Sequence, residues 1–396
     1  MMVRGKRVRI LVVTDGYFPS RAACAVRMKV LVETLRGCGD DVQVLASDTS
    51  LAGDKSYVPP DYVHFFPVAE MGKKTIVNRL KNNLSGSAGA VRAARGLGHF
   101  DVVLVTSPPI LMVNAALKIA KAKRAKLVFD VRDIWPDVGF EMGSFAPGSV
   151  YGRVFGRIAT KAYKASSLIT TVSEGKAEKI RSRIPLEDAE KVQIVANGLD
   201  LSFTEQTVDD AIITRFGLDK GKSCVYVGNI GLAQGLDNML ELAKSRPEVN
   251  FLLFGEGASK DRLEEAARSE CLDNVSFCGT LDSRGVYSVL SRADASYVPL
   301  VNSNLSDSIP TKMFESIGCG CPVLLAASGD SVRVLEDIGL GLSAAPEDVN
   351  AQLDCLDRIL AGAFADGEKR RAAAYVRANY SRQAEGEKLS NMIHSI

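Results

Sequence analysis

Short apolar runs alternate with longer stretches of helical character along most of the chain. Each run spans only a few residues and is rich in Val, Ile and Leu, which predicts a strand buried on both faces. The predicted strands are 8–13, 42–46, 102–106, 126–130, 168–172 and 192–196, followed by 224–228, 250–255, 274–279, 295–300 and 322–326. Helical periodicity lies between them, for example at 25–36, 110–123, 235–244 and 260–269. This alternation predicts an α/β fold with parallel sheets covered by helices.

A polar stretch without a clear strand separates the two series of runs, directly after Asn197-Gly198-Leu199-Asp200. A chain of 396 residues also exceeds the about 250–300 residues that one core usually reaches. We therefore expect two Rossmann-like, doubly wound domains, 1–203 and 204–378, and a C-terminal helix within 379–396 that crosses back to the first domain. Because ligands bind at the carboxyl ends of such strands, a cleft between the domains is the expected site.

Charge is distributed unevenly between the two halves. Residues 1–203 hold 30 Lys and Arg against 19 Asp and Glu, whereas the remainder holds 19 against 28, so the halves should face different partners. No apolar run approaches the roughly 18 residues of a membrane-spanning helix, and the run 8–13 is too short for a signal peptide. Eight scattered cysteines without a C-x-x-C pair and three isolated histidines predict a cytoplasmic protein without a metal site or bound cofactor.

The segment from Asp307 to Pro322, which begins Asp-Ser-Ile-Pro-Thr-Lys-Met-Phe-Glu, carries the most specific chemistry. Pro310 suits the first turn of a helix, and Ser308 could cap it. A helix N-terminus offers backbone N–H groups to a diphosphate, and Lys312 would add a full positive charge. Glu315 lies one turn further along the same helix face, where a carboxylate can accept hydrogen bonds from the two hydroxyls of a ribose.

This segment resembles the acidic-x7-acidic element of the family 4 retaining glycosyltransferases, with Asp307 as the first acid and Glu315 as the second. The segments Tyr226–Leu236, Asn250–Lys260, Asn274–Gly279 and Ala293–Leu300 match the donor domain of that family in order and spacing. The resemblance implies a GT-B fold and a nucleoside-diphosphate sugar as donor, most simply a UDP-sugar. The donor-binding residues that it implies are Gly16, Asn229, Gln234, Gly255, Glu256, Lys260, Ser308, Ile309, Pro310, Thr311, Lys312 and Glu315.

Two segments of the first half refine this resemblance. Arg132-Asp133-Ile-Trp135-Pro-Asp follows a predicted strand, and Thr106-Ser-Pro-Pro follows another. Both are similar to segments of bacterial members that transfer N-acetylated aminosugars during surface-polysaccharide assembly, such as that of O-antigen or capsule. We expect Asp133, Lys312 and Asp307 as catalytic residues, and Arg21, Arg27 and Arg132 as acceptor-binding residues. The role of Asp133 is a hypothesis, because many family members place a histidine in the first domain for this role and none of the three histidines matches it. Arg27 could equally be an exposed arginine of the first helix.

A basic segment suggests where the acceptor is located. Between residues 73 and 95, six Lys or Arg residues are interleaved with aliphatic side chains, and no acid is present. Such a pattern favours the inner membrane surface and a lipid-diphosphate-linked or glycan acceptor, although a solvated basic helix shows the same pattern. Nucleic acid is disfavoured because no recognised binding module accompanies the charge.

The chain departs from the family where many relatives carry Arg or Lys, because Asn229 and Gln234 stand there. Ala22 and Ala23 replace a common Gly-Gly pair. These departures keep a non-catalytic nucleotide-sugar binding protein open, and a nucleotide-sugar 2-epimerase of the same fold is a second alternative. A dinucleotide-dependent oxidoreductase is disfavoured because the third glycine of G-x-G-x-x-G is missing. No Asp-x-Asp pair is present, so we expect turnover without an obligatory divalent ion.

Overall fold

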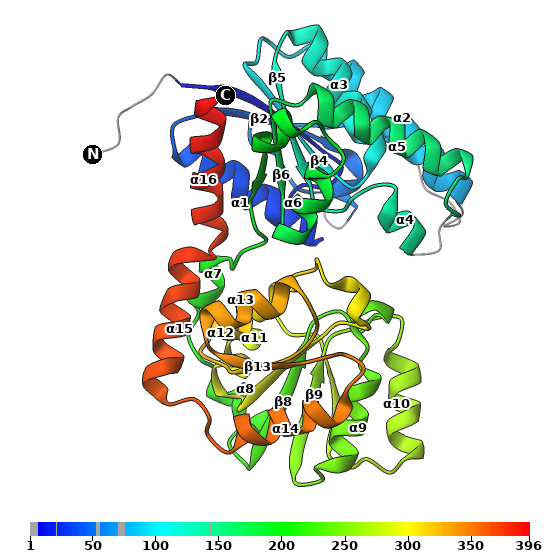
Figure 1. Ribbon diagram of the computed structural model, residues 1–396. Coiled ribbons are helices and arrows are strands. Elements are labelled where there is room, and N and C mark those ends of the chain that lie inside the picture. Colours follow the sequence, from blue (N-terminus) through cyan, green and yellow to red (C-terminus); the bar gives the residue numbers. More distant parts are fainter. Residues whose placement is uncertain (1–6, 21, 53–55, 70–75, 142–144) are drawn as a thin grey trace. The chain divides into compact units, whose positions relative to one another are not determined.

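The computed structural model describes residues 7–396 except 21, 53–55, 70–75 and 142–144, together with the side chains of those residues apart from 23, 76–81 and 141. Contacts divide the chain into two compact units. Unit 1 comprises Met1–Ala196 and Arg382–Ile396, and unit 2 comprises Asn197–Ser381. Each unit is an α/β body with a parallel sheet (Figure 1).

Unit 1 contains a seven-stranded sheet in the order β3-β2-β1-β4-β5-β6-β7. The strands are β1 (Arg9–Thr14), β2 (Asp41–Ser47), β3 (Val63–Phe66), β4 (Val102–Ser107), β5 (Lys126–Val131), β6 (Leu168–Thr171) and β7 (Val192–Ile194). The helices are α1 (Ala23–Gly37), α2 (Ile76–Ala94), α3 (Ile110–Lys123), α4 (Asp137–Glu141), α5 (Val150–Ala165), α6 (Glu174–Arg181) and α16 (Arg382–Ser395). Short 3-10 helices span Asp48–Leu51 and Leu186–Lys191.

Alternate residues of β1 supply two separate cores, one on each face of this sheet. Leu11 and Val13 join the core beneath α2, α3 and α5, whereas Ile10 and Val12 join the core beneath α1 and α16. The C-terminal helix α16 packs against α1 (Figure 1). This packing is so close that a Cβ on Gly386 would lie 2.7 Å from the Cβ of Thr34.

Unit 2 contains a six-stranded parallel sheet in the order β10-β9-β8-β11-β12-β13. The strands are β8 (Lys222–Val227), β9 (Val249–Phe254), β10 (Val275–Gly279), β11 (Ala295–Pro299), β12 (Val323–Ala326) and β13 (Gly341–Ala344). The α-helices are α7 (Leu201–Thr204), α8 (Asp210–Arg215), α9 (Asp237–Ser245), α10 (Lys260–Ser269), α11 (Ser283–Arg292), α12 (Thr311–Gly318), α13 (Asp330–Ile338), α14 (Val349–Leu360) and α15 (Asp366–Asn379). Two 3-10 helices, Leu232–Gln234 and Ser303–Leu305, follow β8 and β11.

The predicted fold class is therefore confirmed: both units are Rossmann-like, and the C-terminal helix belongs to the first. The strand order reverses between β1 and β4 in unit 1, and between β8 and β11 in unit 2. Such reversal points open a crevice at the carboxyl ends of the strands, where open α/β sheets bind their ligands. Among the described residues, no helix is long and apolar enough to cross a membrane.

Candidate active site

Lys312 and Tyr226 meet at the reversal point of unit 2. Lys312 lies in the first turn of α12, and Tyr226 is a buried residue near the end of β8. The Lys312 Nζ donates a hydrogen bond of 2.7 Å to the Tyr226 hydroxyl, which in turn donates to the backbone carbonyl of Asn229. The ammonium group is thereby held beside the loop that follows β8.

Two glycines make room for this arrangement. A Cβ on Gly228, whose φ is +139°, would lie 2.2 Å from the Cε of Lys312. A Cβ on Gly255, whose φ is +148°, would lie 1.8 Å from the carbonyl oxygen of Gly228. A side chain at Gly228 would be strained by the backbone conformation and would displace the end of Lys312, and one at Gly255 would clash with backbone. Glycine at both positions therefore lets the loops after β8 and β9 approach each other and the lysine.

The environment of Lys312 weakens its hold on a proton. Burial lowers the pKa of Lys312 to about 8, although the nearby Glu315 carboxylate opposes this shift. A poorly hydrated ammonium group at a helix start gains more from an added anion than a solvated one does. This part of unit 2 is therefore suited to a diphosphate.

The other predicted residues near Lys312 lie in α12 or in the segment just before it. Ser308, Ile309 and Thr311 are partly exposed, and Glu315 lies one turn into the helix and is also partly exposed. Ser308 does not cap α12, which corrects the expectation from the sequence: Pro310 is the N-cap residue, and no side chain caps the helix. Asp307 lies in the loop between the 3-10 helix Ser303–Leu305 and α12.

Asn229 and Gln234 flank Gly231 in the loop after β8. The Gln234 side-chain oxygen accepts a hydrogen bond of 3.2 Å from the Gly231 amide, and a Cβ on Gly231 would lie 2.4 Å from the Asn229 Nδ2. Gln234 thus closes the turn where many relatives carry a cation. Lys260 is paired with Glu256 at 2.7 Å, so its charge is largely compensated within unit 2.

In unit 1, Arg132 and Asp133 follow β5 at the carboxyl edge of the sheet. The Arg132 Nε donates to the Thr106 hydroxyl at 3.0 Å, and its Nη2 donates to the Pro108 carbonyl at 3.1 Å. These bonds fasten the loop after β5 to the loop after β4. Asp133 is partly exposed beside them.

Asp15 joins this edge from the loop after β1, although the sequence reasoning gave it no role. Burial raises the pKa of the Asp15 carboxyl, and the positive charge of Arg132 opposes that shift. Gly16 follows directly, and its carbonyl accepts a hydrogen bond from the Thr14 hydroxyl. The signal was available in the sequence, because Asp15 is the first charged residue after a predicted strand.

Arg27, which was predicted to bind the acceptor, is buried and makes its contacts within unit 1. It is 4% exposed, and its Nη2 lies 3.1 Å from the Asp130 carboxylate. The same guanidinium donates to the carbonyls of Val195 and Ala196. Arg27 therefore ties α1 to β5 and to the segment after β7. Arg21, also predicted to bind the acceptor, lies outside the described residues.

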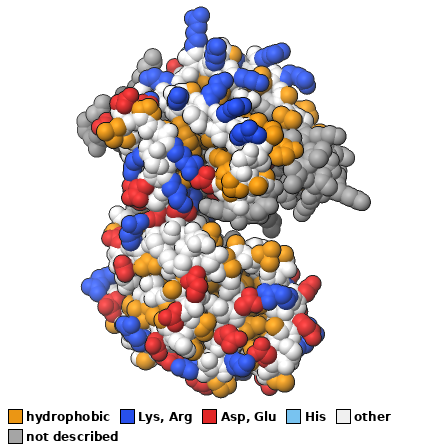
Figure 2. Space-filling view, turned by 45° about the vertical axis from the view of Figure 1, so that its right-hand side comes forward, with side chains coloured by type: hydrophobic (Ala, Val, Ile, Leu, Met, Phe, Trp, Pro, Cys, Tyr) orange, Lys and Arg blue, Asp and Glu red, His pale blue; other side chains and the backbone are white. Residues whose placement is uncertain are grey.

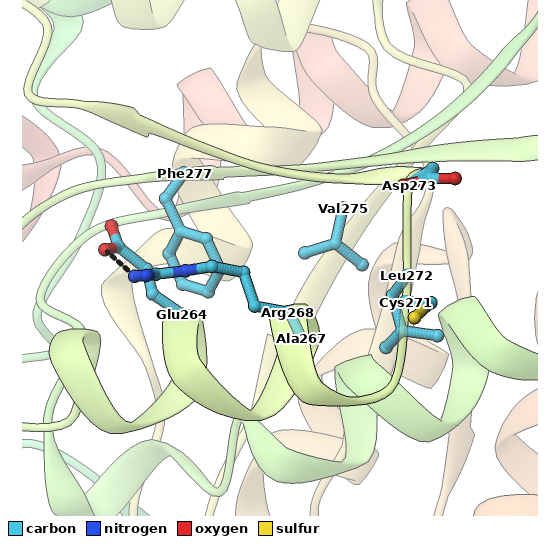
Figure 3. Close-up of a pocket in the computed structure, with 8 residues that line it drawn as sticks. All are labelled: Glu264, Ala267, Arg268, Cys271, Leu272, Asp273, Val275 and Phe277. Carbon is cyan, nitrogen blue, oxygen red and sulfur yellow. Dashed lines mark ion pairs between the residues drawn. The ribbon is translucent and has the colours of Figure 1, made fainter.

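A cavity of about 520 Å³ in unit 2 lies between the end of α10 and the start of β10. Figure 3 shows Phe277 and Val275 facing the helix, with Arg268 extended toward Glu264, 3.7 Å away. Because the turn after α10 leads into β10, this cavity opens at the amino ends of the strands. It is therefore separate from Lys312, which lies at the carboxyl ends.

Within the described part of the chain, no group of three or more His, Cys, Asp or Glu side chains could hold a metal ion. All eight cysteines are free thiols. Burial raises the pKa of Cys224 and of Cys319 to about 12, so these two are protonated at neutral pH.

Comparisons with known proteins agree with this geometry. The model of the glycosyl transferase 4-like domain matches residues 23–198, and that of the glycosyl transferases group 1 matches residues 209–378. The putative colanic acid biosynthesis glycosyl transferase WcaI of Escherichia coli is 24% identical over 63% of this chain. This match spans 64% of the E. coli protein, a little under two thirds of its length.

Another relative, the D-inositol 3-phosphate glycosyltransferase of Xylanimonas cellulosilytica, is 28% identical over 75% of this chain and 73% of its own. Among solved structures, Anabaena HepE in complex with UDP-glucose has a TM-score of 0.73 at 15% identity, covering 98% of this chain and 100% of HepE. Sucrose-phosphate synthase of Thermosynechococcus elongatus has a TM-score of 0.74 at 17% identity, covering 98% and 99%. These two similarities concern the fold. Because a glycosyltransferase family model matches each half of the chain, the chain is a glycosyltransferase of GT-B fold.

Proposed function

We propose that this glycosyltransferase moves an N-acetylaminosugar from a UDP donor to a lipid-linked or glycan acceptor, with retention of the anomeric configuration. The observation that carries the donor half of the proposal is the Lys312 ammonium, which Tyr226 holds at the reversal point of unit 2. The solved neighbour with UDP-glucose bound supports a uridine nucleotide. A role in surface-polysaccharide synthesis is supported by the relative that is named for colanic acid biosynthesis.

The proposed roles follow the chemistry of the residues. Lys312 and the backbone of 309–312 hold the diphosphate, and Glu315 accepts hydrogen bonds from the ribose. Asp307 is the first acid of the acidic-x7-acidic segment that ends at Glu315. Gly16 and Asp133 face the donor sugar, where a carboxylate stabilises positive charge that develops at the anomeric carbon. Arg132 contacts the acceptor, and the basic stretch 73–95, part of which lies outside the described residues, brings the enzyme to the inner membrane surface.

In the proposed reaction, the acceptor oxygen forms a bond to the anomeric carbon while the bond from that carbon to the diphosphate breaks. The departing diphosphate takes the proton of the acceptor hydroxyl, so no protein base is required. The protein contributes positioning and electrostatic stabilisation of the leaving group.

Two alternatives stay open. The uncharged residues Asn229 and Gln234, at positions where many relatives carry cations, leave room for a non-catalytic binding protein, and a nucleotide-sugar 2-epimerase shares the two-domain architecture. A nucleotide-sugar 2-epimerase would convert the donor without an acceptor, and a binding protein would neither convert nor transfer. Incubation of UDP-N-acetylglucosamine with and without a lipid-diphosphate acceptor, followed by product analysis, separates all three.

The donor site is tested by thermal shift with UDP, GDP, ADP, dTDP and UDP-N-acetylglucosamine. A ligand at about 100 times its Kd stabilises the native state by about 2.7 kcal/mol, so UDP at millimolar concentration should raise the Tm by several degrees. We expect Glu315→Ala to remove most of this shift, because the ribose then loses its carboxylate partner. If no nucleotide raises the Tm of the wild type, the donor assignment is wrong.

Nucleotide affinity should fall as the pH rises above about 8. The pKa of Lys312 in the free protein is lowered to about 8, so the ammonium is present below that pH and is lost above it. Bound diphosphate favours the charged form, so the Kd for UDP should rise by up to tenfold per pH unit above 8. Calorimetric titration of the wild type and of Lys312→Met between pH 6.5 and 9.5 measures this. A wild-type profile as flat as that of the variant would exclude the lysine from binding.

A further inference from the structure

Helix α5 in unit 1 carries an unusual charge. Its four cationic residues are Arg153, Arg157, Lys161 and Lys164, and it contains no acid. The chain has no Asp or Glu from residue 142 to residue 173, on either side of this helix. Intervals of four, four and three residues place all four cations on one helix face.

The opposite face of α5 packs on the core of unit 1 and fixes the orientation of the helix. Ala159, Ala162 and Tyr163 are buried in the core of unit 1, and the ring of Tyr163 stacks on that of Phe129 in β5 at 5.7 Å. Because these contacts are apolar and tight, the helix cannot rotate to hide its cations. The basic face is therefore a fixed surface of unit 1.

Apolar side chains interrupt this basic face at its start. Val150 is 66% exposed and Val154 is 40% exposed, and Tyr151 beside them is also exposed. A shallow groove of about 620 Å³ along the helix is lined by Gly156, Arg157, Thr160, Lys161, Lys164 and Ala165. This lining combines small residues with three cations. Isolated exposed valines are ordinary on protein surfaces, but a cluster beside cations on one helix is typical of interfacial helices.

The cations of α5 lack the acidic partners that several cations of unit 2 have. Lys244, Arg246 and Arg262 of unit 2 pair with Glu270, Asp357 and Asp237. Among the described residues, none of the four cations of α5 forms an ion pair or a side-chain hydrogen bond. In Figure 2, Lys and Arg side chains predominate on the visible face of unit 1, whereas both signs mix on that of unit 2.

We propose that the exposed face of α5, from Val150 to Lys164, is a docking surface for a bilayer of anionic lipid. The cations meet the headgroups, the groove admits a lipid phosphate between Arg157 and Lys161, and Val150, Tyr151 and Val154 enter the boundary of the acyl chains. A nucleic acid or a purely acidic protein surface would satisfy the cations but would leave the valines in water. This inference rests on the proposed transfer to a lipid-linked acceptor, and it adds a surface distinct from the stretch 73–95.

The surface is tested by cosedimentation of the full chain with vesicles of phosphatidylcholine alone or with 30% phosphatidylglycerol. We expect binding to the anionic vesicles, weakened by high salt, and no binding to phosphatidylcholine alone. Lys161→Gln/Lys164→Gln should weaken binding roughly 25-fold, at about fivefold per cation. Val150→Ser/Val154→Ser should weaken it several-fold as well. The matched control is Arg370→Gln/Arg371→Gln on α15 of unit 2, which removes two exposed cations and should change nothing.

The outcomes separate this surface from the donor site. The thermal shift with UDP is also measured for each variant and should equal that of the wild type. An equal shift shows that the variant is folded and that its donor site is intact. Vesicle binding that is equal in the α5 variants and the wild type overturns the docking surface while the donor site stands. Binding to duplex RNA as tight as to vesicles, with no effect of the valine changes, also overturns it.

Discussion

Replacing Lys312 by Met should lower kcat/KM for sugar transfer by about 10²–10³-fold. The expected loss is that of one positioned group that stabilises charge in the transition state, about 2.7–4 kcal/mol. In the proposed reaction, negative charge grows on the diphosphate as it leaves, and Nζ of Lys312 is held 2.7 Å from the Tyr226 hydroxyl at that edge of the sheet. Steady-state kinetics with a UDP-sugar and a lipid-diphosphate acceptor measures the effect.

Methionine suits this test because it keeps the length of the side chain and removes the charge. Burial already lowers the pKa of Lys312, which means that the folded state disfavours the ammonium, so Lys312→Met should unfold at no lower urea concentration than the wild type. Tyr226→Phe keeps the lysine but removes its hydrogen-bond partner, and we expect a loss of about tenfold. Lys312→Met with wild-type kcat/KM would contradict the proposed role, and a fully active Asp133→Ala would do the same for Asp133.

The sequence pattern predicted most of the strands because parallel strands that are buried on both faces leave a continuous apolar signal. Two strands were not predicted. The edge strand β3, Val63–Phe66, is four residues long and includes His64, and β13, Gly341–Ala344, consists of Gly-Leu-Ser-Ala. Both are edge strands with only partial burial, so their sequences carry little of the hydrophobic pattern.

The site was predictable where its residues share one helix and not where distant segments meet. Lys312 and Glu315 are three residues apart, so helical periodicity alone places them on one face. The contact between Lys312 and Tyr226 joins residues 86 positions apart. It also depends on glycines with positive φ, and the backbone angles of a glycine cannot be predicted from the sequence. The burial of Arg27 was not predictable either, because nothing in the sequence near an arginine on an amphipathic helix indicates that a buried carboxylate faces it.

Breaking the buried ion pair of unit 1 should destabilise the protein by about 3–5 kcal/mol. Asp130 is 2% exposed, and its carboxylate accepts hydrogen bonds from Arg27, Thr106 and Thr170. Arg27→Met removes one charge and leaves the carboxylate in the core without its counter-ion. The carbonyls of Val195 and Ala196 lose their donors as well. Urea unfolding followed by circular dichroism should show a lower midpoint, and a loss under 1 kcal/mol would mean that water or another group replaces the guanidinium.

The double variant Arg27→Met/Asp130→Leu separates the structural role of the arginine from a role in catalysis. Removing both charges avoids the isolated buried carboxylate, so most of the lost stability should return. If Arg27 acts only as a tie between α1 and β5, the double variant should also recover the wild-type KM for the acceptor. If the arginine contacts the acceptor, the KM stays high although the stability has returned. Both residues belong to unit 1, so the thermal shift with UDP should be that of the wild type whether or not Arg27 contacts the acceptor. Any change in KM then reports on acceptor binding alone.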